Sequence, residues 1–226
     1  MPRQPDPRPV RHALVVATAH DRPTRQLLSA ARKAEGLLRE AGYGVVACYK
    51  DDATRDGVFS RLLGIRGEVH AGFLAAHGST GGLHDRNREL LMDANVAKRF
   101  PACVLIIASC LHDGSFPRKT VANDSAKACI GYRGRLYAVP NAKFWSRLMS
   151  SSKHARALDD FDECTLAPLA GLLGKKLSAG RATSNAQALW EEKSRQYLAD
   201  DVRINFVFRA NARAIQCWGN RQARLG

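Results

Sequence analysis

Five short runs of apolar residues alternate along the chain with segments of helical periodicity. The runs cover residues 12–19, 45–49, 69–76, 103–109 and 129–132. Each run is nearly continuous in apolar residues, which is typical of strands that are covered on both faces. Buried strands that alternate with helices indicate an α/β fold with a mostly parallel central sheet and helices on both faces.

The first helical segment carries signals at both of its ends. Asp21 and Pro23 occupy the positions where a helix cap and a first-turn proline are favoured. Apolar residues then recur at helical spacing, at Leu27, Ala31, Ala34, Leu38 and Ala41. Gly42 follows, and glycine closes a helix readily because it adopts the left-handed conformation. We therefore expect strand, helix and strand in that order, with a second helix over residues 53–63.

The middle of the chain continues this alternation with longer connections. Residues 78–87 are rich in glycine and polar residues and predict a surface loop. A small strand is expected at 89–92, and Asp93 then caps a short helix. Residues 111–117 predict another loop, and residues 120–128 predict a helix that leads into the fifth strand.

The last third of the chain is less regular. Residues 150–163 contain a serine run and an aspartate-rich patch, and we expect an exposed connection there. Helices are expected over residues 166–177 and 182–197. Residues 203–208 and 212–218 alternate apolar with polar side chains, which predicts an antiparallel pair at the edge of the sheet.

The length and the terminal composition bound the domain organisation. A chain of 226 residues suits one sizeable domain. We expect residues 1–10, which hold four prolines, to form a flexible N-terminal arm and residues 11–226 to form a single domain. No apolar run approaches the roughly 20 residues that cross a bilayer, and the start lacks the apolar core of a secretion signal. These features predict a cytoplasmic protein that does not enter membranes.

Motifs for metals and cofactors are missing from the sequence. The six cysteines show no CxxC spacing, so neither a zinc site nor a disulfide framework is indicated. The turn after the first strand, at residues 18–21, has no glycine-rich loop for phosphate groups. We therefore expect no metal and no cofactor.

The chain carries a formal net charge of +14, from 35 basic and 21 acidic residues. Such a charge fits a nucleic-acid partner, an anionic protein partner or a basic solvated surface. The basic residues are spread along the chain and accompany no nucleic-acid recognition motif. We interpret them as a solvated face, with only weak or indirect contact to nucleic acid.

A histidine and a cysteine directly follow two of the apolar runs. His77 closes the third run and Cys110 the fourth, so neighbouring parallel strands would deliver both to one edge of the sheet. A thiolate is a nucleophile, and an imidazole can take the thiol proton and later protonate a departing amine. The amides of Gly78 and Cys110 would stabilise an oxyanion. Taken singly, the same residues also fit a core thiol and a turn, and both interpretations stay open.

Three motifs in this order resemble those of caspase-like (clan CD) cysteine proteases. The sequence reads Phe-Leu-Ala-Ala-His-Gly-Ser at residues 73–79, Leu-Ile-Ile-Ala-Ser-Cys at 105–110 and Ala-Cys-Ile-Gly-Tyr-Arg-Gly at 128–134. The chain is most similar to the CHAT type of domain and more distantly resembles gingipain and separase. The resemblance implies a caspase-hemoglobinase-like three-layer sandwich. It also implies peptide-bond hydrolysis, with Cys110 as the nucleophile and His77 as the general acid.

The resemblance also implies where a substrate would lie. In this family the strand that matches residues 130–134 helps to build the pocket for the residue before the scissile bond. Substrate contacts are therefore implied at Ile130, Gly131, Tyr132 and Arg133, and Asp113 would favour a basic side chain there. Ala108 stands where metacaspases and clostripain-like enzymes have an aspartate, so a strict preference for Arg or Lys is not implied.

The leading hypothesis is a bacterial effector peptidase that acts on a protein or peptide. An activating protein partner, or cleavage within residues 150–163, would switch it on. One alternative is a catalytically silent caspase-like adaptor module, although an adaptor needs neither His77 nor Cys110. Another alternative is a basic nucleic-acid-binding α/β domain, which would bind in a salt-dependent way without any role for Cys110.

Overall fold

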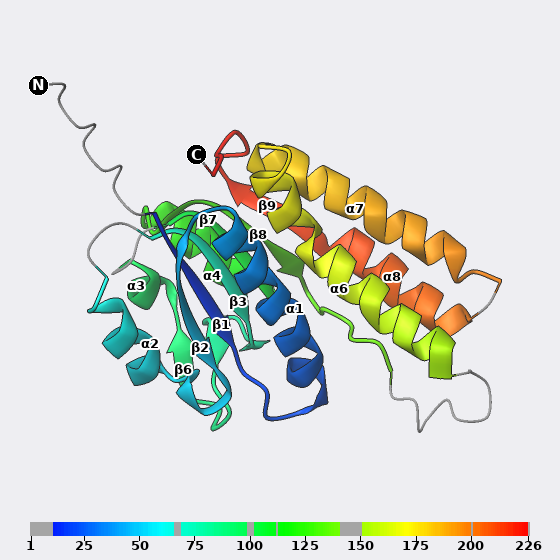
Figure 1. The fold of residues 1–226 in the computed structure, drawn as a ribbon, viewed down its shortest axis with the longest axis horizontal. Helices are drawn as coiled ribbons and strands as arrows, with labels where there is room; N and C mark the ends of the chain where they lie inside the picture. The colour runs from blue at the N-terminus through cyan, green and yellow to red at the C-terminus, as the bar shows by residue number, and fades with distance from the viewer. Residues whose placement is uncertain are drawn as a thin grey trace, which may run out of the picture.

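The computed structural model describes residues 11–65, 69–98, 102–111, 113–140, 151–199 and 201–225, so the expected N-terminal arm lies outside the described residues. A six-stranded sheet forms the centre of the molecule, in the order β2-β1-β3-β7-β8-β9 (Figure 1). The strands are β1 (His12–Ala17), β2 (Gly44–Tyr49), β3 (Val69–Ala75), β7 (Ala102–Leu111), β8 (Ala126–Arg133) and β9 (Ile215–Gly219). The first five run parallel, and β9 pairs antiparallel with β8 at the edge.

Alternate residues of each central strand pack into two different apolar clusters. In β1, Ala13 and Val15 face one cluster, while Leu14 and Val16 face the other. Successive side chains of a strand point to opposite faces, so a nearly continuous apolar run fills both clusters at once. The sheet is thus buried on both faces, and the predicted α/β class is confirmed.

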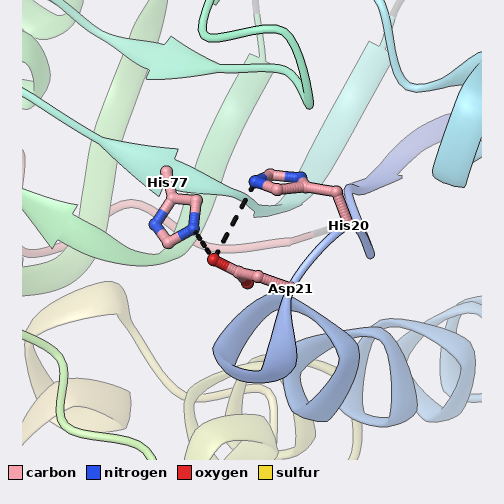
Figure 2. A group of neighbouring side chains, drawn as sticks. All are labelled: His20, Asp21 and His77. Atoms are coloured by element: carbon pink, nitrogen blue, oxygen red, sulfur yellow. Dashed lines mark hydrogen bonds and ion pairs between the residues drawn. The ribbon is translucent and has the colours of Figure 1, made fainter.

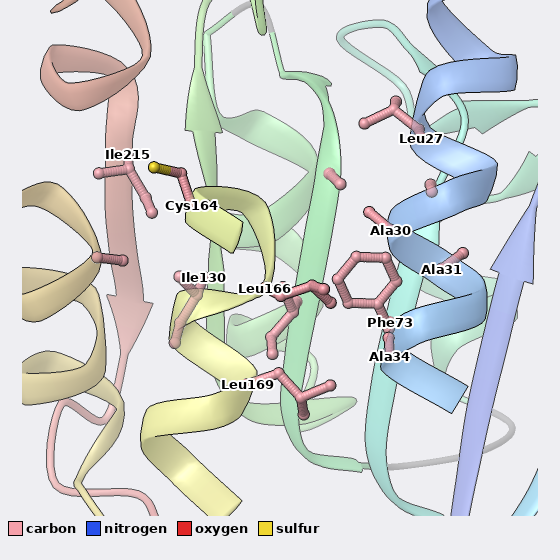
Figure 3. Packing of buried hydrophobic residues seen from close by; sticks show 14 of the residues in the cluster. Leu27, Ala30, Ala31, Ala34, Phe73, Ile130, Cys164, Leu166, Leu169 and Ile215 are labelled. Atoms are coloured by element: carbon pink, nitrogen blue, oxygen red, sulfur yellow. The ribbon is translucent and has the colours of Figure 1, made fainter. Parts of the chain in front are cut away.

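Four of the helices within the described residues cover one face of the sheet (Figure 1). They are α1 (Arg22–Glu40), α6 (Ser151–Leu173), α7 (Ala179–Gln196) and α8 (Val202–Ala214). Figure 3 shows how α1 and α6 meet over the strands, with Phe73 of β3 between Ala34 of α1 and Leu166 of α6. Trp190 of α7 is fully buried, with its ring edge-on to that of Tyr132 in β8.

In the part of the chain that the structure describes, three shorter helices and a small second sheet cover the opposite face. The helices are α2 (Arg55–Leu62), α3 (Ala94–Ala97) and α4 (Ser115–Ala122). The second sheet consists of β4 (His77–Gly78), β5 (Leu83–His84) and β6 (Leu90–Met92). Leu83 and Met92 of this sheet are buried against the central one. The chain that follows β3 is therefore anchored to the core on this side.

Helix α1 begins and ends as its sequence predicts. Asp21 is the N-cap, and its side chain and Thr24 form a reciprocal capping box. Gly42 has a φ of +83°, which glycine adopts without the steric cost of a side chain. The capping fixes where α1 starts, one residue after Asp21 at the carboxyl edge of the sheet.

The exposed connection expected over residues 150–163 is wrong, because most of this segment belongs to α6. Ala157, Phe161 and Cys164 are completely buried and recur at helical spacing. Polar residues separate these apolar positions in the sequence, so the segment as a whole has the composition of a loop. Cleavage in this segment would therefore cut within a helix rather than within an exposed connection.

Two other expectations differ from the structure at element boundaries. Residues 203–208 lie in α8 rather than in a strand: Ile204 and Phe208 are buried, while Phe206 is 55% exposed. Residues 212–214 also lie in α8, so only residues 215–218 of the expected hairpin form a strand, as part of β9. The helix expected over 120–128 is wrong, because α4 ends at Ala122 and β8 starts at Ala126.

The two loops expected after β3 and β7 are more ordered than predicted. Residues 78–87 include the short strands β4 and β5, and α4 already begins within residues 111–117. Strands of two residues leave no periodic signal in a sequence.

Candidate active site

His77 and Cys110 meet at the carboxyl edge of the central sheet. Strands β3 and β7 are direct neighbours, paired from Ala71 opposite Val104 to Ala75 opposite Ala108. His77 follows β3 and Cys110 lies near the end of β7, and both line a cavity of about 580 Å³. The topology therefore places both side chains on one cavity at this edge of the sheet.

An irregularity in β7 shapes this edge. The pairing of β7 with β8 shifts between Ile107 and Cys110: Ile107 pairs with Gly131, and Cys110 with Tyr132. The two intervening residues of β7 have no counterpart in β8. Bulges of this kind bend a strand and redirect its side chains, and they occur often beside active sites.

Gly78 packs directly against the nucleophile candidate. A Cβ atom at this position would overlap the carbonyl oxygen of Cys110 and the hydroxyl of Ser109. Only glycine therefore allows the backbone after His77 to approach β7 so closely. Both predicted oxyanion donors, the amides of Gly78 and Cys110, belong to residues that line the cavity.

A carboxylate holds the imidazole of His77. Figure 2 shows Asp21, the N-cap of α1, beside His77, with 2.5 Å between Asp21 Oδ2 and His77 Nε2. Burial acts to raise the pKa of Asp21. Hydrogen bonds from the hydroxyl and amide of Thr24, together with the contact to His77, outweigh this effect and lower the pKa to about 2. Asp21 is thus an anion at neutral pH, and it also lies 3.9 Å from Nε2 of His20.

The contact with Asp21 assigns roles to the two ring nitrogens of His77. Because Nε2 faces the carboxylate, it carries a proton, and Nδ1 is the nitrogen that can exchange a proton with a thiol or a substrate. A carboxylate behind an imidazole also stabilises the positive charge that forms on proton uptake. The sequence pattern at Asp21 predicts only a helix cap. Its proximity to His77 follows from the strand order, which places β1 beside β3.

Cys110 differs from most other cysteines in its surroundings. It is half-buried, and its Sγ accepts a hydrogen bond of 3.4 Å from the amide of Leu136. Burial raises the pKa of the Cys48 thiol to about 11, and burial also raises the pKa values of Cys129 and Cys164. High pKa values suppress the thiolate, so these buried thiols are poor nucleophiles.

The segment after β8 forms a wall of the cavity that sequence reasoning missed. Residues 135–140 line it, and buried Asn211 of α8 holds Tyr137 through two bonds of 2.9 Å, to its amide and its carbonyl. Arg22 of α1 donates to the carbonyl of Val139 at 2.7 Å. Side chains from two distant helices thus fix this wall, which has no periodicity of its own.

The residues expected to contact substrate lie elsewhere, and none is among the described residues that line the cavity. Ile130 and Tyr132 are buried in the core under α7, and Gly131 packs against Ile107. Arg133 is exposed. The carboxylate of Asp113 accepts a hydrogen bond from the Ser115 amide at the start of α4.

Comparisons with known proteins find relatives only among solved structures. No protein-family model and no curated protein matches the chain. The chain is similar to the Arg-specific cysteine proteinase gingipain R (RgpB), with a TM-score of 0.57 at 14% identity over 95% of this chain and 47% of that chain. It is also similar to the complex of the Porphyromonas gingivalis RgpB pro- and mature domains, with a TM-score of 0.54 at 14% identity over 95% and 48%.

This likeness shows the fold. The chain has the caspase-like α/β fold of the gingipain structures and spans about half of their length. Of the helices in the described ranges, none is both long and apolar enough to cross a membrane.

Proposed function

We propose that the protein is a cysteine endopeptidase in which Cys110 is the nucleophile and His77 the general acid and base. One observation supports this most: a half-buried thiol and an imidazole held by a carboxylate share one cavity. The caspase-like fold, which the gingipain proteinases also have, supports the same class of reaction.

The reaction follows from these positions in two stages. The thiol proton of Cys110 passes to Nδ1 of His77, and the thiolate attacks the carbonyl carbon of the peptide bond. The carbon–nitrogen bond breaks, His77 protonates the departing amine, and the acyl group stays on Sγ as a thioester. Water then attacks the thioester and gives a proton to His77, which returns it to the sulfur as the acid product leaves.

The amides of Gly78 and Cys110 would donate to the oxyanion of both tetrahedral intermediates. Asp21 is a positioning residue in this proposal, since it touches His77 and not the substrate. It keeps the proton on Nε2 and the ring in place through both stages.

The finer features of the assignment are also proposals. We assign the chain to a CHAT-type effector of the cytoplasm. Its substrate is a protein or peptide that lies along the cavity wall at residues 135–140. In the gingipain complex a pro-domain accompanies the mature domain, which supports control of this chain's activity by another polypeptide.

Labelling with a peptidyl electrophile tests the nucleophile. Cys110 should react fastest, and His77→Ala should slow both labelling and peptide hydrolysis by about 10² to 10⁴-fold, the usual contribution of a general acid–base group. Cys103→Ala is the matched control, because Cys103 is a half-buried thiol at the other end of β7. The proposal is contradicted if the electrophile labels Cys103 or Cys217 as fast as Cys110. A folded protein that is not labelled at Cys110 and does not hydrolyse peptides supports the silent adaptor instead.

A further inference from the structure

Three possible metal ligands converge beside the catalytic imidazole. His20, Asp21 and His77 each offer one ligand atom, and these atoms all lie within 4.8 Å of one another. Oδ2 of Asp21 lies 2.5 Å from Nε2 of His77 and 3.9 Å from Nε2 of His20. Figure 2 shows both rings turned toward the one carboxylate, and the ring centroids are 5.1 Å apart. His20 and Asp21 come from the turn after β1, and His77 begins β4, two residues after the end of β3, the strand next to β1.

This ligand set suits a divalent d-block cation. Two imidazoles and one carboxylate are typical ligands of Zn²⁺, which leaves one position open to water or substrate. Bonds of about 2.0–2.2 Å in a tetrahedron place neighbouring ligand atoms about 3.3 Å apart. The Asp21–His77 distance would open from 2.5 Å, and the His20–Asp21 distance would close from 3.9 Å. Each of these two changes is smaller than about 1 Å.

The geometry points to a Zn²⁺ site formed by His20, Asp21 and His77, whose occupation switches the peptidase off. The inhibition rests on the proposed peptidase function, whereas the binding of Zn²⁺ does not depend on it. Neither His20 nor a metal is needed for the hydrolysis described above.

Inhibition follows from the tautomer of His77. Without metal, Nε2 carries the proton that faces Asp21, and Nδ1 is free to accept the proton of the thiol. With the metal on Nε2, the single ring proton lies on Nδ1, which then cannot accept another. The imidazole can no longer shuttle a proton for Cys110, and a chelator that removes the metal restores it.

Calorimetric titration of the full chain carrying Cys110→Ala tests binding without any thiolate at the site. ZnCl₂ should bind with one ion per chain, and MgCl₂ should not bind, since Mg²⁺ prefers oxygen ligands. Adding His20→Ala should weaken the binding of Zn²⁺ at least about tenfold. His12→Ala is the matched control, because His12 lies at the opposite end of β1 and should leave the affinity unchanged.

Two results overturn the site. One is that His20→Ala leaves the affinity for Zn²⁺ unchanged. The other is that His12→Ala lowers this affinity as much as His20→Ala does. His20 lies in the turn between β1 and α1 and belongs to neither apolar cluster, so its replacement should preserve the fold. His20→Gln with an unchanged Tm provides a second variant. Added Zn²⁺ should raise the Tm of the Cys110→Ala protein but not that of its His20→Gln derivative.

Peptide hydrolysis separates this inference from the proposed function. In the wild-type chain, Zn²⁺ should inhibit hydrolysis, a chelator should restore it, and His20→Ala should require at least about ten times more Zn²⁺. If no variant hydrolyses peptide but the binding pattern holds, the peptidase proposal fails and the metal site stands. If hydrolysis occurs and its sensitivity to Zn²⁺ does not depend on His20, the metal site fails alone.

Discussion

Asp21 serves two structural roles with one side chain. Its Oδ1 accepts the Thr24 amide and hydroxyl at the start of α1, while its Oδ2 faces His77. The charge that caps the helix therefore also orients the imidazole, and both partners hold the carboxylate in its ionised form. A cap placed at the carboxyl edge of a parallel sheet is close enough to a neighbouring strand end to act on its side chain.

We predict that Asp21→Asn lowers kcat by tenfold or more, with little change in KM or Tm. Asparagine caps helices as well as aspartate does, but a neutral amide cannot stabilise a positive imidazole. Kinetics and thermal unfolding measure the three quantities. Asp93→Asn is the control, since Asp93 caps α3 through the Val96 amide in the same way. If the two substitutions change kcat equally, Asp21 acts only as a helix cap.

At the scale of elements, the cavity depends on how α1 and α8 hold the segment after β8. Asn211 of α8 is completely buried and satisfies both backbone groups of Tyr137. Gln26 of α1 accepts from the Val139 amide at 3.1 Å. Helices that are far apart in sequence thus replace the ladder of hydrogen bonds that a strand would supply.

We predict that Asn211→Ala raises KM several-fold and lowers the free energy of unfolding by about 1–3 kcal/mol, because two half-buried backbone groups of Tyr137 lose their partner. Enzyme kinetics and urea unfolding check the two effects. Asn205→Ala is the matched control on the same helix, since Asn205 donates to the Ser194 carbonyl at 2.8 Å, away from the cavity. It should destabilise similarly and leave KM unchanged. A parallel rise in KM for both variants would show that the wall has no specific role.

At the scale of the whole molecule, we expect a formal net charge of +14 to make the folded state less stable in acid. Protonation of carboxylates adds positive charge to an already positive surface and increases its self-repulsion. Glu35 is one carboxylate that resists protonation. A hydrogen bond from Tyr49 of β2 lowers its pKa, against the effect of burial, and Arg39 lowers it further. This ion joins α1 to β2 and therefore contributes to the packing of the sheet edge.

We predict that Glu35→Gln lowers the free energy of unfolding at pH 6 to 8, and that its difference from wild type shrinks as the pH falls below about 4.5. A carboxyl group whose pKa is lower in the folded than in the unfolded state stabilises the fold at pH values above its unfolded pKa of about 4.3. This stabilisation disappears as the pH falls through the pKa of the folded state. Urea unfolding at a series of pH values measures this. Glu40→Gln, at the exposed end of the same helix, is the control. A difference that stays constant down to pH 3 would contradict the linkage.

The sequence by itself determined the fold class and much of the order of elements. Nearly continuous apolar runs such as Val69–Ala75 can only be buried on both faces, and the cap at Asp21 and the glycine at 42 mark the ends of α1. These signals are local, because each depends on neighbours within a few residues. The same order of elements explains why His77 and Cys110 were expected to be near each other.

Only the tertiary structure decided what surrounds these two residues. Asp21 reaches His77 across 56 positions, and Asn211 reaches Tyr137 across 74, so no local pattern reports either contact. The polar residues around Phe161 interrupt the apolar stripe of α6, so the sequence predicted a connection there. The alternation of apolar and polar residues around Phe206 predicted a strand, but this segment is part of α8. Periodicity shows which face of an element is buried, but the partner that covers that face is fixed only when all elements pack together.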